Sequence, residues 1–253
     1  MALVQLNVDE GIAHLELNRP EARNAINLAL GRELAAHLEA LAPREDVRVL
    51  VLSGAGGKAF AAGADIAELR ERTHREALLA FNPRLFQQVE DFPRPTVAAI
   101  EGYALGGGLE LALACDVRVA AQGARLGLPE ASLGILPGAG GTWRLPRLVG
   151  LGRAKELVFT GRLVEADEAA SLGLVEQVCP AGGALAAAKA LAASIARNAP
   201  LALQVAKLAL NTAARGGDPA PLEKLGQGLL MDSEDKRARM TAFLERKQRG
   251  GAS

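Results

Sequence analysis

Short apolar runs alternate with stretches of helical periodicity along the first half of the chain. Residues 4–8 and 12–17 have the pattern of two strands, and a turn follows at residues 18–20. Apolar positions then recur at helical spacing from Ile26 to Leu41, which predicts a helix. The same scheme returns later, with strands predicted at residues 47–52, 96–100 and 117–120 and a helix at residues 107–115. Such alternation predicts an α/β core in which helices pack on sheets.

The pattern becomes helical after residues 198–200. We therefore place a boundary near residue 195, between a core at residues 1–195 and a helical region at residues 196–253. The apolar positions of this region include Leu225, Leu229, Met240, Phe243 and Leu244. Because so short a region has little room for a core of its own, these positions are expected to pack on the core or on a neighbouring subunit.

Charge and composition argue against several classes of partner. The 253 residues include 29 basic and 29 acidic side chains, so no overall field attracts nucleic acid or an anionic membrane. The sequence has no signal-peptide pattern and no apolar run long enough to span a membrane. Two cysteines without CxxC spacing indicate a reducing compartment, and three scattered histidines argue against a metal site. We expect a soluble, cytoplasmic protein with no metal, no nucleic-acid partner and no membrane partner.

Two carboxylates lie close in sequence to a helix that opens on glycine. Gly107 and Gly108 lead into an apolar helical stretch that carries Glu110, and Glu130 follows within a Leu-Pro-Glu sequence. The first N–H groups of such a helix are free to meet an anion, which the helix dipole also favours. Glu110 shares a helical face with Gly107, and its side chain leans toward the helix N-terminus. Donor and carboxylate are therefore predicted to converge.

A second glycine-rich helix start lies at residues 60–66. Asp65 and Glu68 have the spacing of an N-cap pair, which by itself predicts only a capped helix. Together with the helix start at Gly107, however, two backbone N–H groups from separate segments can bracket one oxygen. The two helix starts thus predict an oxyanion hole.

Each glutamate also has a simpler interpretation. A single Glu on a helix is usually exposed, but the residues around Glu110 are apolar on every side. A buried carboxylate is costly unless it has partners or a task. Glu130 follows a proline, where a surface role fits as well as a functional one. Its combination with Glu110 and the two predicted donors favours a catalytic role.

Three longer motifs carry a likeness to a known family. They are AAGADI at residues 61–66, GYALGGGLELALACD at residues 102–116 and PEASLGILPGAGGT at residues 129–142. They resemble the motifs of the enoyl-CoA hydratase/isomerase (crotonase) family, and the chain is most similar to its enoyl-CoA hydratases. The likeness begins at residues 17–25 and continues to residues 242–247, so it covers nearly the whole chain.

This resemblance implies a fold, a substrate and an assembly. The fold is a spiral of repeated ββα units, followed by a C-terminal helical region that forms trimers and often hexamers of two trimers. The substrate is an acyl-CoA thioester, and no separate cofactor is expected. By motif position, the N–H groups of Ala64 and Gly107 hold the thioester oxygen, while Glu110 and Glu130 are the catalytic acids. Such fixed donors stabilise an enolate as it forms.

The presence of both glutamates favours hydration, because isomerases of this family usually keep only the later one. We assign Glu110 to activating the water that attacks C3 and Glu130 to supplying a proton to C2. Leu128 and Trp143 stand where many short-chain hydratases have glutamine. Leu128 and the stretch at residues 107–121 are more similar to the methylglutaconyl-CoA hydratase branch. That activity is one alternative. An RNA-binding or scaffolding member is another, which the glutamate pair and the neutral charge disfavour.

By the same resemblance, coenzyme A is held by local cations and by backbone groups. The candidates are Ala22, Arg23, Ala62, Asp65, Ile66, Phe243, Arg246 and Lys247, the last three from this chain or from a neighbouring subunit. Arg246 and Lys247 fit equally well as solvated charges at a helix end.

Overall fold

The computed structural model describes residues 2–250, with side chains for residues 2–246. The chain forms two compact units, residues 1–195 and residues 196–253. The helices of the first unit are η1 (Pro20–Ala22), α1 (Leu28–Leu41), α2 (Ile66–Glu71), α3 (His74–Leu78), α4 (Phe81–Glu90), α5 (Gly107–Ala114), η2 (Glu130–Leu133), α6 (Gly141–Val149), α7 (Leu151–Thr160), α8 (Ala166–Ser171) and α9 (Ala184–Ala196). Its strands form two sheets.

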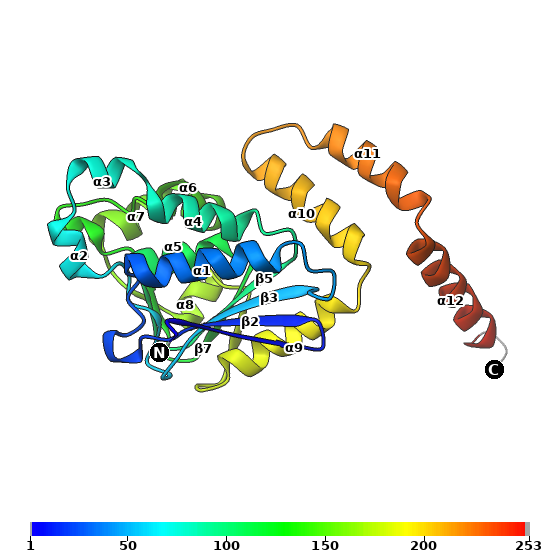
Figure 1. Cartoon of the computed structure of the whole chain (residues 1–253), viewed down its shortest axis with the longest axis horizontal. Coiled ribbons are helices and arrows are strands. Elements are labelled where there is room, and N and C mark those ends of the chain that lie inside the picture. Colours follow the sequence, from blue (N-terminus) through cyan, green and yellow to red (C-terminus); the bar gives the residue numbers. More distant parts are fainter. Residues whose placement is uncertain (1, 251–253) are drawn as a thin grey trace. The chain divides into compact units, whose positions relative to one another are not determined.

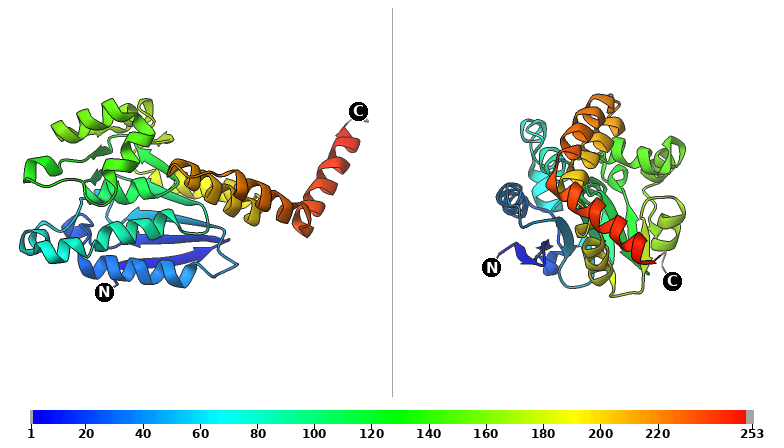
Figure 2. Two further views of the ribbon diagram at one scale, coloured as in Figure 1. Left: turned by 90° about the horizontal axis from the view of Figure 1, so that it is seen from above. Right: turned by 90° about the vertical axis from the view of Figure 1, so that its right-hand side faces the viewer.

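The larger sheet has six strands in the order β1-β2-β3-β5-β7-β10. Their bounds are β1 (Val4–Asp9), β2 (Ile12–Leu17), β3 (Val49–Gly54), β5 (Thr96–Ile100), β7 (Val117–Ala121) and β10 (Gln177–Cys179). Only β1 runs antiparallel to its neighbour; the other pairs are parallel. Helices α1 and α4 lie side by side over this sheet (Figure 1, Figure 2). The predicted α/β core is confirmed.

The smaller sheet has four strands in the order β4-β6-β8-β9. Their bounds are β4 (Ala59–Ala61), β6 (Tyr103–Leu105), β8 (Arg125–Gly127) and β9 (Val164–Glu165). Successive strand pairs β3 and β4, β5 and β6, and β7 and β8 each give one strand to each sheet before helices follow. This repetition is the spiral of ββα units that the resemblance implied.

Local differences from the predicted elements have clear causes. The helix predicted from Ile26 begins two residues later, because Asn27 caps it by accepting the N–H of Leu30. Ile26 instead bridges to Ala64 in parallel fashion. Asp65 caps α2 as expected, but Glu68 accepts the N–H of Leu28 and so ties α2 to α1 instead of completing the N-cap pair. Both differences draw the first helix toward the loop that carries Ala64.

The second unit consists of α10 (Pro200–Ala214), α11 (Ala220–Met231) and α12 (Glu234–Gly250). Helices α10 and α11 pack closely, since a Cβ added at Gly226 would lie 2.3 Å from a methyl group of Val205. Large apolar side chains nevertheless stay exposed in this unit, among them Leu225, Leu229, Met240 and Phe243. Among the described residues, no helix combines the length and apolar character needed to cross a membrane.

Candidate active site

Three neighbouring parallel strands of the smaller sheet end at one place. The chain leaves β4 toward Ala64, leaves β6 toward Gly107 and leaves β8 toward Glu130. The carboxyl ends of parallel strands meet at the same sheet edge, which is the usual location of a site in α/β proteins. The sheet therefore brings together residues that lie far apart in the sequence.

Two backbone N–H groups meet at this edge. A Cβ added at Gly107 would lie 3.4 Å from the nitrogen of Ala64, so the two segments lie close together. The neighbouring N–H groups of Ala62 and Asp65 donate to carbonyls of Arg23 and Ile26. Ala64 and Gly107 themselves donate to no group within the described residues. The predicted pair of donors is thus adjacent and available.

Glycine is required on both sides of this junction. Gly106 has φ +50, and a Cβ there would lie 2.9 Å from Oε1 of Glu130. A Cβ at Gly108 would lie 2.0 Å from the carbonyl oxygen of Ala61. A side chain at either position would force α5 away from β4 or displace the Glu130 carboxylate. The glycine run therefore brings backbone close to backbone, and helix α5 starts at the sheet edge.

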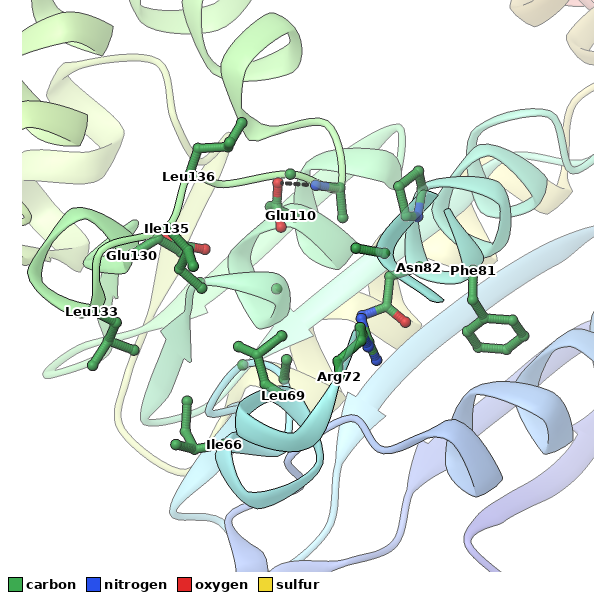
Figure 3. A pocket seen from close by; sticks show the side chains of 18 of the residues that line it. Ile66, Leu69, Arg72, Phe81, Asn82, Glu110, Glu130, Leu133, Ile135 and Leu136 are labelled. Atoms are coloured by element: carbon green, nitrogen blue, oxygen red, sulfur yellow. Dashed lines mark hydrogen bonds between the residues drawn. The ribbon is translucent and has the colours of Figure 1, made fainter. Parts of the chain in front are cut away.

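Glu110 lies in the first turn of α5 and is buried. Its Oε1 accepts the N–H groups of Ala139 and Gly141 at 2.7 and 2.8 Å. Burial raises the pKa of Glu110, while these two N–H groups and the nearby charge of Arg144 oppose the rise. One carboxylate oxygen is thus fixed by the turn before α6, and the carboxylate stays oriented in the pocket (Figure 3).

A buried ion pair supports this turn, and the sequence analysis did not identify it. Arg144 donates from Nε to Oε2 of Glu90 at 2.7 Å and from Nη1 to the carbonyl of Ala139 at 3.0 Å. Its guanidinium also stacks on the Trp143 ring, 3.9 Å from the centroid. Since Ala139 also donates its N–H to Glu110, Arg144 connects Glu90 on α4 to the placement of Glu110.

Glu130 opens η2 and is also buried, but its carboxyl group has little support. Its Oε2 is buried and has no hydrogen-bond partner among the described residues. Burial raises the pKa of Glu130 to about 7, its own backbone N–H opposes the rise, and the charge of Glu110 adds to it. This carboxyl group can therefore carry a proton near neutral pH.

The two glutamates line one pocket together with the candidate donors Ala64 and Gly107. Much of the remaining wall is apolar and comes from α2, α4, η2 and the segment that follows η2, including Ile66, Leu69, Leu133, Ile135 and Leu136 (Figure 3). Within the described residues, no cluster of three or more His, Cys, Asp or Glu side chains could hold a metal ion. The arrangement can bind a carbonyl oxygen, and it can move protons on either side of a bound group.

Comparison with known proteins agrees with the motifs. Residues 7–250 match the family described as enoyl-CoA hydratase/isomerase. The chain belongs to the enoyl-CoA hydratase/isomerase family.

Individual members of this family match over nearly their whole length. A short-chain-enoyl-CoA hydratase of Clostridium acetobutylicum is 39% identical, covering 97% of this chain and 95% of the relative. A 2,3-dehydroadipyl-CoA hydratase of Escherichia coli is 45% identical, covering 92% of each chain. The crystal structure of an enoyl-CoA hydratase from Bacillus anthracis superposes with a TM-score of 0.92 at 40% identity, covering 96% of each chain. The crotonase fold of this chain is therefore shown by sequence and by structure.

The candidate coenzyme A residues of this family member fall into separate groups. Ala62 and Ile66 line the pocket, whereas Ala22, Arg23 and Asp65 do not. Arg23 is exposed, with its guanidinium 6.0 Å from the centroid of the Tyr103 ring. The side chain of Asp65 is engaged, because it caps α2 and forms an ion pair with Arg19 at 3.1 Å. Its backbone N–H donates to the carbonyl of Ile26 and its carbonyl accepts the N–H of Leu69, so the backbone polar groups of Asp65 are engaged as well.

The other three candidates lie on α12. Phe243 is exposed, and so is Arg246. The side chain of Lys247 lies outside the described residues. Because these residues belong to the second unit, their role in binding coenzyme A stays a prediction.

Asn24 is a further residue that the sequence analysis did not single out. It is fully buried with φ +56, and its amide donates to the carbonyls of Ala55 and Ala59. Its Oδ1 accepts the N–H of Arg19. Asn24 thus links the loop of η1 to the start of β4. An asparagine within the family motif at residues 17–25 was the available signal.

Proposed function

We propose that this protein adds water across the double bond of trans-2-enoyl-CoA thioesters. The observation that supports this most is the meeting of two free N–H groups and two buried carboxyl groups in one pocket. Water addition to a conjugated thioester needs a site for the enolate oxygen, a base and an acid. Each of these has a candidate group here.

The thioester oxygen accepts the N–H groups of Ala64 and Gly107. This oxygen gains negative charge when the hydroxyl adds at C3, so donors already fixed by the backbone stabilise the enolate more than the ground state. Gly107 is the first residue of α5, and the helix dipole adds to the effect at that end.

The two glutamates divide the proton transfers. Ionised Glu110 takes a proton from water as the oxygen of that water bonds to C3. Neutral Glu130 then gives its proton to C2, and the thioester carbonyl re-forms. The pKa of Glu130, raised to about 7 chiefly by burial, suits a proton donor near neutral pH. After these steps Glu110 carries a proton and Glu130 has lost one. One proton then passes from Glu110 to Glu130, directly or through solvent, and restores the starting state.

The experiment must separate hydration from isomerisation, since the family includes both activities. Purified protein is given a trans-2-enoyl-CoA series and a 3-enoyl-CoA of matched length. Hydration lowers the absorbance of the conjugated thioester, whereas isomerisation of the 3-enoyl-CoA raises it. We expect loss of absorbance with the 2-enoyl series. An increase with the 3-enoyl substrate and no loss with the series would assign the protein to isomerisation.

Coenzyme A enters as part of the substrate, so no separate cofactor is proposed. The exposed apolar side chains of α11 and α12 support a homo-oligomer, a trimer or a hexamer of two trimers.

Hydration of 3-methylglutaconyl-CoA stays an alternative that the same series can include. An RNA-binding or scaffolding role has no supporting feature in the described residues, and the cytoplasmic location stays a prediction.

A further inference from the structure

Two polar side chains in the pocket have no part in the reaction proposed above. Arg72 directly follows α2, and Asn82 lies in the first turn of α4. Both line the pocket that contains Glu110 and Glu130. Figure 3 shows them on one side of this pocket, with Glu130 on the opposite side and Glu110 between. If Glu130 serves C2 and Glu110 serves C3, the acyl chain extends from C3 toward Arg72 and Asn82.

Neither side chain is held by a hydrogen bond or an ion pair in the part of the chain that the structure describes. Asn82 is only 9% exposed and lines the pocket, so its amide is open to a group bound there. Buried polar groups are nearly always hydrogen-bonded, because desolvation without a partner is costly. The unpartnered amide therefore points to a ligand that completes it.

Carboxylates near Arg72 do not neutralise it. Arg72 also borders a surface groove that contains Glu68, Glu71 and Glu76. The hydrogen bond from the Thr73 backbone N–H is the largest of the causes that lower the pKa of Glu76. The charge of Arg72 is the smallest of them. The Glu76 carboxylate is held by the N–H and the hydroxyl of Thr73, each at 2.8 Å. The guanidinium thus remains available to a group in the pocket.

We propose that Arg72 and Asn82 bind a carboxylate at the far end of the acyl chain. A guanidinium matches the two oxygens of a carboxylate, and the amide can donate a further hydrogen bond. The N-terminus of the ten-residue helix α4 adds a favourable dipole at the same place. The pocket wall also includes Leu69, Ala77, Phe81 and Pro83, which suit methylene groups. The substrate class is then a 2-enoyl-CoA derived from a dicarboxylic acid, an inference that rests on the proposed hydration.

The test compares two thioesters that differ only at the far end. One is a six-carbon trans-2-enoyl-CoA that ends in a carboxylate, and the other ends in a methyl group. kcat/KM for each is measured with the unaltered protein and with Arg72→Gln, Arg72→Lys and Asn82→Leu. Arg84→Gln is the matched control, because it removes an exposed cation of α4 that does not line this pocket.

We expect the unaltered protein to prefer the carboxylate-ended thioester. Arg72→Gln should lower kcat/KM for that substrate about 10- to 100-fold, as loss of a hydrogen bond to a charged group does, and should leave the methyl-ended substrate nearly unchanged. Asn82→Leu should act in the same direction, and Arg72→Lys should recover part of the loss. Arg84→Gln should change neither substrate.

Three results would overturn the inference. The first is efficient hydration of the methyl-ended thioester with no preference for the carboxylate-ended one. This result would exclude a carboxylate site but would leave the proposed hydration intact. Equal losses on both thioesters that vanish with a pantetheine thioester would assign Arg72 to the nucleotide phosphates instead. Hydration of neither thioester would remove the proposed function, and this inference with it.

Discussion

Oε1 of Glu110 accepts two backbone N–H groups, whereas Oε2 of Glu130, in the same pocket, is buried without a partner among the described residues. Burial raises the pKa of both groups, but the N–H groups of Gly141 and Ala139 oppose the rise at Glu110. Hydrogen bonds to a carboxylate favour its ionised form, and desolvation favours its neutral form. The two environments thus suit Glu110 as the base and Glu130 as the acid.

The raised pKa of Glu130 makes folding stability depend on pH. Its ordinary pKa is 4.5 and its pKa in the folded protein is about 7. Folding therefore favours the neutral form of the Glu130 carboxyl group. Its contribution to the free energy of unfolding is fully present below pH 4.5 and is lost as pH rises through about 7. Glu130→Gln cannot ionise, so its Tm relative to the unaltered protein should rise between about pH 5 and about pH 8. Thermal unfolding across this range measures the difference.

The matched control for this experiment is Glu39→Gln, an exposed change on α1. Its Tm difference should stay flat over the same pH range. A Tm difference for Glu130→Gln that is equally flat would mean that Glu130 ionises normally in the folded protein.

Gly107→Pro tests the oxyanion donor. Proline has no N–H, and its fixed φ is compatible with the first position of a helix, which Gly107 occupies. We expect kcat to fall about 10²- to 10³-fold, as it does when one such donor is removed. Gly107→Ala retains the donor and places its Cβ 3.4 Å from the Ala64 nitrogen, so it separates shape from hydrogen bonding. Equal losses in both variants, with folding intact by circular dichroism, would remove Gly107 as the donor.

Glu90→Gln tests the support behind Glu110. It leaves Arg144 buried without the carboxylate that accepts its Nε, and breaking a buried pair typically costs about 3–5 kcal/mol of unfolding free energy. Because Arg144 also holds the Ala139 carbonyl, we expect kcat to fall while KM changes little. Urea unfolding and steady-state kinetics measure both effects, and Gln88→Ala on the exposed face of α4 is the control. Unchanged kcat in a stably folded Glu90→Gln would show that the pair serves stability alone.

Leu225→Glu combined with Leu229→Glu tests the role of the second unit. These side chains are 73% and 59% exposed in the single chain, so charges there should be harmless to a monomer. If they form a subunit interface, each buried charge opposes assembly and light scattering should report a smaller species. An unchanged mass would place the interface elsewhere.

Much of the core was readable from the sequence because apolar periodicity determines it. The strands at residues 4–8, 12–17 and 96–100 were predicted within one residue, since each is bounded by turn or polar residues. The helix at Leu28–Leu41 was predicted two residues too long, because the Asn27 cap is a local hydrogen bond that apolar spacing does not reveal. Periodicity locates elements, whereas side-chain hydrogen bonds set their ends.

The candidate site was readable only where it is local in the chain. Gly107 and Glu110 lie on one helix turn, and their convergence followed from helix geometry. The pair of Glu90 and Arg144 joins α4 to α6 across 54 positions, and no single-sequence pattern reveals such a contact. Arg72 and Asn82 were missed for the same reason, because only the fold brings them to the pocket.

Hydration is expected to depend on both Glu110 and Glu130. The direct measurement is kcat for a short trans-2-enoyl-CoA, followed by loss of the conjugated thioester absorbance, for the unaltered protein, Glu110→Gln and Glu130→Gln. Each substitution removes a proton-transfer group at nearly constant shape, so we predict that kcat falls about 10²- to 10⁴-fold with little change in KM. Retention of the full hydration rate by either variant would show that the substituted glutamate transfers no proton in hydration.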